Sequence, residues 1–295
     1  RLGLPKPEDI TSVTLSPATS ANADTEVAQS VSYIFTYVSY YGEEGVNCDA
    51  EAAQVVDKHT DQTVTLDFPP NPSGSYNFLY RRVYRTDSGG TYRFVQDVPI
   101  ATDTFADTVA DIALGEEIPT VTNDAPADDD AADHKDGPLL GLVSMPNGIL
   151  AGFAGQTVSF SEAFEPHAFP DEYKLTVKSD VVALSPLNTG LLVLTKGKPA
   201  IIQGLDPSSM SMMEIDSSLS CVSKRSVVDM GEFTVYASPD GLVMATDSGL
   251  NLVTDQTFTR DQWQAFGPSS ITGYLWEGQY IGFYSHGGVS KGFIF

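Results

Sequence analysis

The chain has few basic residues, few cysteines and no long apolar run. Sixteen Lys and Arg stand against 39 Asp and Glu among 295 residues, which gives a formal net charge of −23. Because nucleic-acid backbones and anionic membrane surfaces are held mainly by Lys and Arg, this balance argues against a protein that grips either. No stretch approaches the roughly 18 apolar residues of a membrane-spanning helix, and the N-terminus lacks the basic and then apolar pattern of a signal peptide.

The two cysteines, Cys48 and Cys221, are far apart in the sequence and match no metal-binding or redox spacing. We expect two buried thiols in a reducing compartment. A single long-range disulfide is the alternative.

Apolar residues in the first hundred positions alternate or come in short β-branched and aromatic runs bounded by Gly, Pro, Asn and Asp. Such runs are typical of strands. The expected strands are Ser30–Tyr41, Val64–Phe68, Tyr80–Tyr84, Tyr92–Val95 and Thr104–Asp107. After a short leading segment at residues 1–7, the pattern predicts an ordinary seven-strand sandwich over residues 8–114.

Residues 115–137 then carry many carboxylates among Ala and Pro, with almost nothing to bury. The acidic positions that define the run are Asp124, Asp128, Asp129, Asp130, Asp133 and Asp136. This composition predicts an acidic linker or exposed loop.

Residues 138–295 repeat groups of three or four short strands, each separated by turn residues such as Pro146-Asn147-Gly148 and Asp247-Ser248-Gly249. The groups begin near Leu139, Val181, Ser226 and Ile271, and recurrence roughly every 40–50 residues is typical of propeller blades. The fourth group stops in mid-pattern, and the first residue is Arg1 rather than Met. We therefore expect a propeller-like domain that is incomplete, in a chain that is processed or part of something longer.

Four stretches in the second half of the chain resemble segments of a known protein family. They are GLVSMPNGILAGFAGQTVSFSEAFEPHAFP (Gly141–Pro170), LLVLTKGKPAIIQGLDPSSMS (Leu191–Ser211), CVSKRSVV (Cys221–Val228) and VYASPDGLVM (Val235–Met244). With IFTYVSYYGEEG (Ile34–Gly45) and RRVYRTDSGGTYRFV (Arg81–Val95) upstream, the chain resembles tail nozzle or tail tubular proteins of tailed phages. In that group a propeller-like body accompanies a fibronectin type III-like module, and the implied fold class is all-β.

This resemblance implies a structural, non-enzymatic subunit of a short-tailed phage virion, made in the host cytoplasm. It implies a homo-oligomeric ring, in our expectation a hexamer, below the portal and adaptor, in contact with other tail and head-tail connector proteins. DNA would pass through the lumen without specific binding. An acidic wall repels phosphates and suits such a conduit, but an acidic exterior that keeps protein molecules apart explains the charge of −23 equally well.

Glu162, Glu165, His167 and Asp171 crowd into ten residues and suggest a divalent metal site or a carboxylate pair. Phe and Pro residues between them favour a structural loop packed on aromatic side chains. The acidic segment suggests calcium, yet it lacks the glycine and closing glutamate of an EF-hand, so a solvated loop is favoured there too.

The turn Asp87–Tyr92 nearly matches the Asp-box of sialidase-type propellers, but Arg85 replaces its Ser and Tyr92 its Trp, so a simple hairpin turn is the better interpretation. No nucleophile elbow, P-loop or dinucleotide fingerprint occurs. The histidines are scattered without recognisable partners, at His59, His134, His167 and His286. The sequence therefore predicts no catalytic, cofactor-binding or metal-binding residues and no cofactor.

The basic residues of the second half concentrate at Lys196, Lys198, Lys224 and Arg225. A DNA contact is one interpretation, but salt bridges to the many carboxylates, within the chain or across a subunit interface, are favoured.

Aromatic residues supply the main rival hypothesis, a carbohydrate-binding or carbohydrate-cleaving tail component. Tyr33, Phe35 and Tyr37 are spaced by two, so they share one face of a strand and are expected in a core, whereas Tyr40 and Tyr41 lie at a loop. Only Trp263 and Trp276 are available for a sugar-stacking groove. A third hypothesis, an adhesion module built from the sandwich alone, leaves the repetitive second half unexplained.

Overall fold

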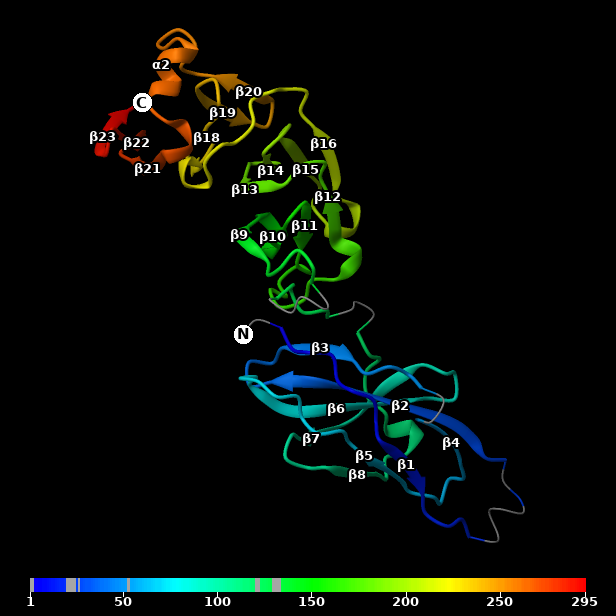
Figure 1. Ribbon diagram of the computed structural model, residues 1–295. Helices are drawn as coiled ribbons and strands as arrows, with labels where there is room; N and C mark the ends of the chain where they lie inside the picture. Colours follow the sequence, from blue (N-terminus) through cyan, green and yellow to red (C-terminus); the bar gives the residue numbers. More distant parts are fainter. Residues whose placement is uncertain (1–2, 20–24, 26, 52–53, 120–122, 129–133) are drawn as a thin grey trace. The chain divides into compact units, whose positions relative to one another are not determined.

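Strands account for most of the regular structure of the computed structural model, so the chain is all-β as predicted (Figure 1). The structure describes residues 3–19, 25, 27–51, 54–119, 123–128 and 134–295. The chain divides into two compact units. Unit 1 comprises Arg1–Pro126 with His167–Pro170, and unit 2 comprises Ala127–Pro166 with Asp171–Phe295.

Unit 1 is a sandwich of two antiparallel sheets. One sheet has the order β1-β5-β8, with strands Ser12–Leu15, Val64–Asp67 and Thr104–Asp107. The other has the order β3-β2-β6-β7, with strands Glu44–Asn47, Gln29–Ser39, Phe78–Thr86 and Tyr92–Pro99, and β4 (Val55–Lys58) pairs with the start of β2. The described residues of unit 1 thus form eight strands, one more than predicted.

The sandwich core is built from residues of both sheets. Tyr33, Phe35 and Tyr37 on β2 are fully buried, as their spacing predicted, and pack with Val64 and Leu66 of the facing sheet. Edge-to-face contacts join Phe35 to Tyr37. Burial of such large side chains is the main force that holds two sheets together.

The sandwich continues beyond residue 114, where the sequence placed the start of a linker. The amide of Phe94 donates to the carbonyl of Glu116 at 2.8 Å, and the amide of Ile118 donates to the carbonyl of Tyr92 at 3.0 Å. Ile118 packs against the sandwich core. These two hydrogen bonds and the side chain of Ile118 attach residues 116–118 to the sandwich. The acidic composition of this segment had predicted that it would be exposed to solvent.

Unit 2 consists of four consecutive antiparallel meanders. The first contains β9–β12, with strands Leu140–Ser144, Leu150–Ala154, Thr157–Phe160 and Lys174–Thr176. The second contains β13–β16, with strands Val181–Pro186, Gly190–Thr195, Ala200–Gln203 and Ser211–Glu214. The third contains β17–β20, with strands Val228–Asp229, Thr234–Ala237, Leu242–Thr246 and Gly249–Leu252. The last contains β21–β23, with strands Thr272–Trp276, Gln279–His286 and Val289–Ile294.

Each sheet of unit 2 packs face to face on the next, in a propeller-like succession. The first strands of consecutive sheets, β9, β13, β17 and β21, contact one another in turn. On β14, Leu191 and Val193 pack toward the first sheet, while Leu192 and Leu194 pack toward the third. Because strand residues alternate between faces, one strand supplies two successive cores, and every residue of β14 is buried.

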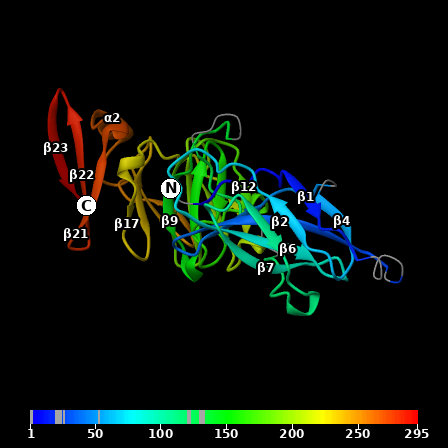
Figure 2. The same ribbon diagram turned by 90° about the horizontal axis from the view of Figure 1, so that it is seen from below.

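Helix α2 (Arg260–Ala265) fills the space between the third and last sheets. A capping box formed by Thr259 and Gln262 starts it. Its Trp263 is buried and donates from Nε1 to the carbonyl of Ser238 at 2.9 Å. Figure 2 shows the last sheet at the end of the series, with α2 beside it.

Short 3₁₀ turns connect the strands at Asp111–Ala113, Pro146–Gly148, Asp171–Tyr173, Pro207–Ser209, Lys224–Ser226 and Pro268–Ser270. Among the described residues, no helix has the length and apolar character needed to cross a membrane.

Candidate functional site

The acidic and histidine cluster expected at residues 162–171 is divided between the two units. Glu162 and Glu165 form a short antiparallel bridge in unit 2, where Asp171 pairs with Lys174. His167 belongs to unit 1. In the part of the chain that the structure describes, no three His, Cys, Asp or Glu side chains gather closely enough to hold a metal ion.

The aromatic residues of that loop have different environments. Phe169 is buried, whereas Phe164 is exposed and has a positive φ of 64°. Tyr173 is buried, and its burial together with the nearby Glu162 raises the pKa of the phenol to about 12. The expectation of a loop packed on aromatic side chains therefore holds for Phe169 but is wrong for Phe164.

The acidic segment is described only in part. Asp129, Asp130 and Asp133, half of the carboxylates from which a calcium site was considered, lie outside the described residues.

The Asp87 turn is a hairpin connection between β6 and β7. One carboxylate oxygen of Asp87 accepts hydrogen bonds from the amides of Gly89 and Thr91 at 2.8 and 3.0 Å. The other accepts from Arg93 Nε at 2.7 Å. The Asp87 carboxylate thus stabilises the turn between β6 and β7.

Three of the four basic residues singled out in the second half, Lys196, Lys198 and Lys224, have partners within the chain. Lys196 pairs with Asp180 at 2.9 Å and Lys198 with Asp216 at 2.6 Å. Lys224 lies over the ring of Phe153, 5.8 Å from its centroid. The salt bridges favoured from sequence are present for Lys196 and Lys198.

A buried ionic cluster joins the two sheets of the sandwich. Asp107 at the end of β8 accepts a hydrogen bond from the hydroxyl of Tyr33 at 2.7 Å and one from Arg85 Nη1. Arg85 also donates from Nη2 to Asp111 at 2.7 Å. Tyr33, Arg85 and Asp107 are all fully buried, and opposite charges paired in this way offset the cost of removing each from water.

The pKa values of this cluster follow from burial and pairing. Burial, with the neighbouring Asp107 carboxylate, raises the pKa of the Tyr33 phenol. Burial by itself lowers the pKa of the Arg85 guanidinium, but Asp107 and Tyr33 more than offset it and raise that pKa. Burial and the charge of Arg85 lower the pKa of Lys58.

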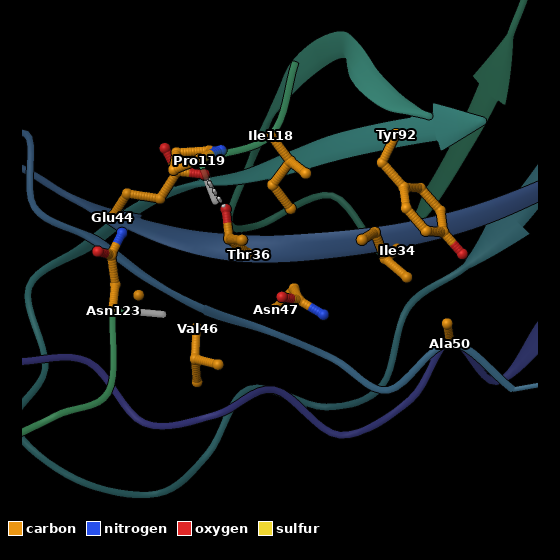
Figure 3. Close-up of a pocket in the computed structure, with 11 residues that line it drawn as sticks. Ile34, Thr36, Glu44, Val46, Asn47, Ala50, Tyr92, Ile118, Pro119 and Asn123 are labelled. Atoms are coloured by element: carbon orange, nitrogen blue, oxygen red, sulfur yellow. Dashed lines mark hydrogen bonds between the residues drawn. The ribbon is translucent and has the colours of Figure 1, made fainter. Parts of the chain in front are cut away.

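A pocket of about 220 Å³ lies on the sheet of β2 and β3 (Figure 3). Glu44 at its rim accepts hydrogen bonds from Thr36 at 2.7 Å and from Tyr84 at 2.6 Å, and it pairs with Arg82 at 2.9 Å. These three donors fix the position of the Glu44 carboxylate at the rim. The rest of the wall is formed mainly by Ile34, Val46, Asn47, Tyr92 and Ile118.

The last sheet presents an exposed apolar face. Its register places two sets of side chains on opposite sides. Tyr280 and Phe293 pack inward against Trp263. The opposite side, here called the outer face, consists of Thr272, Tyr274, Trp276, Gln279, Ile281, Phe283, Ser285, Ser290, Gly292 and Ile294.

None of the side chains of the outer face is charged, although the whole chain carries a net charge of −23. Tyr274 and Phe283 meet edge to face, with ring centroids 6.0 Å apart, and Trp276 is 61% exposed. Contiguous exposed apolar surface of this kind marks an interaction site in soluble proteins. The outer face is the strongest candidate functional surface of the chain. The sequence analysis did not predict the outer face. Alternation of residues along a strand assigns side chains to two faces, but it does not show which face is covered by the rest of the protein.

No protein-family model matches the chain, and no curated protein matches it. The solved structure of YCF48 from Cyanidioschyzon merolae is similar at a TM-score of 0.34 and 10% sequence identity, over 93% of this chain and 95% of that one. At that TM-score the likeness carries no argument about fold or function.

Proposed function

We propose that the chain is a structural subunit of a short-tailed phage tail, one of a ring of nozzle or tube subunits below the portal and adaptor. The observation that carries the proposal is the outer face of the last sheet. A large uncharged apolar surface on a strongly acidic chain suits a protein whose working state is an assembly. Residues 141–170 and 235–244 resemble phage tail proteins, and for this reason we propose that the assembly is a phage tail.

Electrostatics supports the same function. A channel for DNA must not hold the duplex, and phosphates are held by free Lys and Arg. Lys196 and Lys198 are already paired with carboxylates, and the remaining charge is overwhelmingly negative. DNA repelled by such a wall slides through rather than binding.

Immunogold electron microscopy of intact particles tests this function. Antibodies raised against residues 1–295 are expected to label the tail, with antibodies against the major capsid protein as the control that labels the head. Label absent from the tail of particles made by the phage that encodes the chain would contradict the proposal.

A carbohydrate-binding tail component is the second candidate, favoured by one observation. Tyr274 and Trp276 lie exposed on the same side of one strand, as aromatic residues do where sugar rings stack on them. In that case host surface polysaccharide should bind residues 1–295, and Trp276→Ala should abolish the binding while Tyr41→Ala, at an exposed loop, should leave it intact.

A further inference from the structure

A second pocket of unit 1, here called the Lys58 pocket, has a volume of about 370 Å³. Both sheets of the sandwich contribute to its wall. Strands β2 and β4 supply Gln29 and Lys58, and the end of β8 supplies Asp107. Residues 60–63 and 108–111 complete most of the wall.

Gln29 and Lys58 point into this pocket from the same face of their sheet. They stand directly opposite each other in the register of β2 and β4. Residues opposed in this way project to one face, with their Cβ atoms about 5 Å apart. Alternation along β2 gives Gln29 the same side as Tyr33, whose hydroxyl bonds Asp107 of the facing sheet. Both side chains therefore lie on the side of their sheet that faces the other sheet.

Both groups are donors without an acceptor. Lys58 is only 9% exposed, and within the described residues its ammonium makes no hydrogen bond or salt bridge. In the same part of the chain, the buried Nε2 of Gln29 has no hydrogen-bond partner. Buried polar groups of folded proteins are nearly always paired, and a buried charge without a partner is costly. The pocket therefore lacks an acceptor.

The carboxylates that line the Lys58 pocket already have partners. Arg85 bonds both Asp107 and Asp111, and Asp61 accepts from a backbone amide at 2.7 Å. Burial, together with the charge of Arg85, lowers the pKa of Lys58, as expected for an ammonium without a carboxylate in contact. Three carboxylates nearby oppose a multiply charged anion, so a singly charged one suits the pocket better than phosphate.

We propose that the Lys58 pocket binds a small organic carboxylate, one oxygen of which accepts from Lys58 Nζ and the other from Gln29 Nε2. A carboxylate offers two acceptor oxygens and one negative charge, which match two neighbouring donors and one unpaired cation. The volume is within the range of small-molecule sites. The proposal goes beyond the proposed function, because every residue of the site belongs to unit 1 and binding needs no second copy of the chain.

Saturation-transfer NMR of residues 1–295 with butyrate tests the site, in a buffer that contains no other carboxylate and no phosphate. Butyrate is expected to bind. Butyramide has nearly the same shape but no charge, so it should bind at least about tenfold more weakly. Failure of butyrate to bind the folded, unaltered chain at millimolar concentrations would overturn the proposal.

Lys58→Met removes the charge and keeps an unbranched apolar side chain. It should weaken butyrate binding by about tenfold or more. Lys6→Met is the matched control, because Lys6 lies in the same unit and loses the same charge but pairs with Asp49 at the surface. It should bind butyrate like the unaltered chain. Tyrosine circular dichroism verifies that both variants are folded, and equal binding by the two would overturn the proposal.

Gln29→Glu places a carboxylate opposite Lys58 within the chain itself. It should abolish butyrate binding and raise the urea midpoint, because the buried ammonium gains a partner. Butyrate binding that survives this substitution would contradict the assignment of Gln29 and Lys58. Inorganic phosphate that binds more tightly than butyrate, and is lost with Lys58→Met, would overturn the choice of a carboxylate.

Discussion

The hydroxyl of Tyr33 on β2 donates a 2.7 Å hydrogen bond to Asp107 on β8, and both residues are fully buried. The two strands belong to opposite sheets of the sandwich. Arg85 of β6 donates to the same carboxylate. A polar connection thus crosses the core of the sandwich, and it fixes how the two sheets face each other.

Removal of the carboxylate should destabilise the sandwich strongly. Asp107→Asn removes the buried partner of Arg85 and leaves only the partly exposed Asp111 as its paired charge. The expected loss in free energy of unfolding is about 3 kcal/mol, at the low end for breaking a buried ion pair. Tyr33→Phe removes one hydrogen bond to a charged group and should cost about 1.5–3 kcal/mol. Urea unfolding followed by tyrosine circular dichroism measures both.

Tyr92→Phe is the matched control for Tyr33→Phe. The Tyr92 hydroxyl bonds the neutral hydroxyl of Ser32 at 2.9 Å and is only partly buried, so its loss should cost about 1 kcal/mol or less. Equal costs for the two tyrosines would show that the charge of Asp107 contributes nothing.

The two tryptophans should report on different surroundings. Trp263 is buried beside Phe266 and Phe293, whereas Trp276 is largely exposed. Trp276→Phe is expected to remove the red-shifted, acrylamide-quenchable emission, and Trp263→Phe to remove the blue-shifted emission. Both residues lie in unit 2, so Asp107→Asn should leave the spectrum of the native protein unchanged. Measurement at low protein concentration keeps Trp276 free of any partner copy.

The thiols should be inert in the folded protein. Cys48 and Cys221 are free and buried, so the expectation of two buried thiols is confirmed. At pH 8 a disulfide reagent such as Ellman's should react with neither thiol within minutes and with both in guanidinium. Rapid reaction of one thiol without denaturant would place that cysteine at the surface.

Stability should fall at alkaline pH. Burial raises the pKa of Cys48 from 9.0 to about 11 and that of Cys221 to about 12. The unfolded thiols ionise near pH 9 while the folded ones stay protonated, so their contribution is complete below pH 9 and is lost as pH rises toward the folded values. By pH 11 each thiol should lower the free energy of unfolding by on the order of 2 kcal/mol.

Urea midpoints at pH 8, 9, 10 and 11 check this dependence. The double variant Cys48→Ala and Cys221→Ala should show a smaller decline, and the residual slope belongs to buried tyrosines such as Tyr33 and Tyr236, whose pKa values burial also raises. An identical slope with and without the thiols would contradict the assignment.

Local pattern predicted most of the strands and few of the long-range contacts. The β-branched and aromatic run around Tyr33, Phe35 and Tyr37 identified the strand and the burial of these three residues. The intervening Ile34, Thr36 and Val38 are buried as well, so β2 is covered on both faces, which the spacing did not predict. Strand β16 has every side chain exposed, so no such pattern marks it. The six-residue α2 is too short to show helical periodicity, although Thr259 and Gln262 form its capping signal.

The candidate surfaces were harder to predict than the strands. The contacts of Asp107 with Arg85 and Tyr33 join residues far apart in the chain, and no local rule pairs them. The spacing of Glu162, Glu165 and His167 suggested a cluster, but the backbone assigns His167 to the other unit. For the outer face, only the packing of the last sheet on α2 shows which side stays exposed.

The central claim is that this chain is a subunit of a phage tail ring, and quantitative mass spectrometry of purified particles tests it most directly. The tryptic peptides Ser179–Lys196 and Ser226–Arg260, measured against the portal protein, give the copy number. We expect a fixed ratio of about one chain per two portal subunits, which corresponds to a ring of half the portal's copy number, the hexamer of our expectation. Absence of both peptides from particles whose portal is readily detected would contradict the account, and the carbohydrate-binding function would then come first.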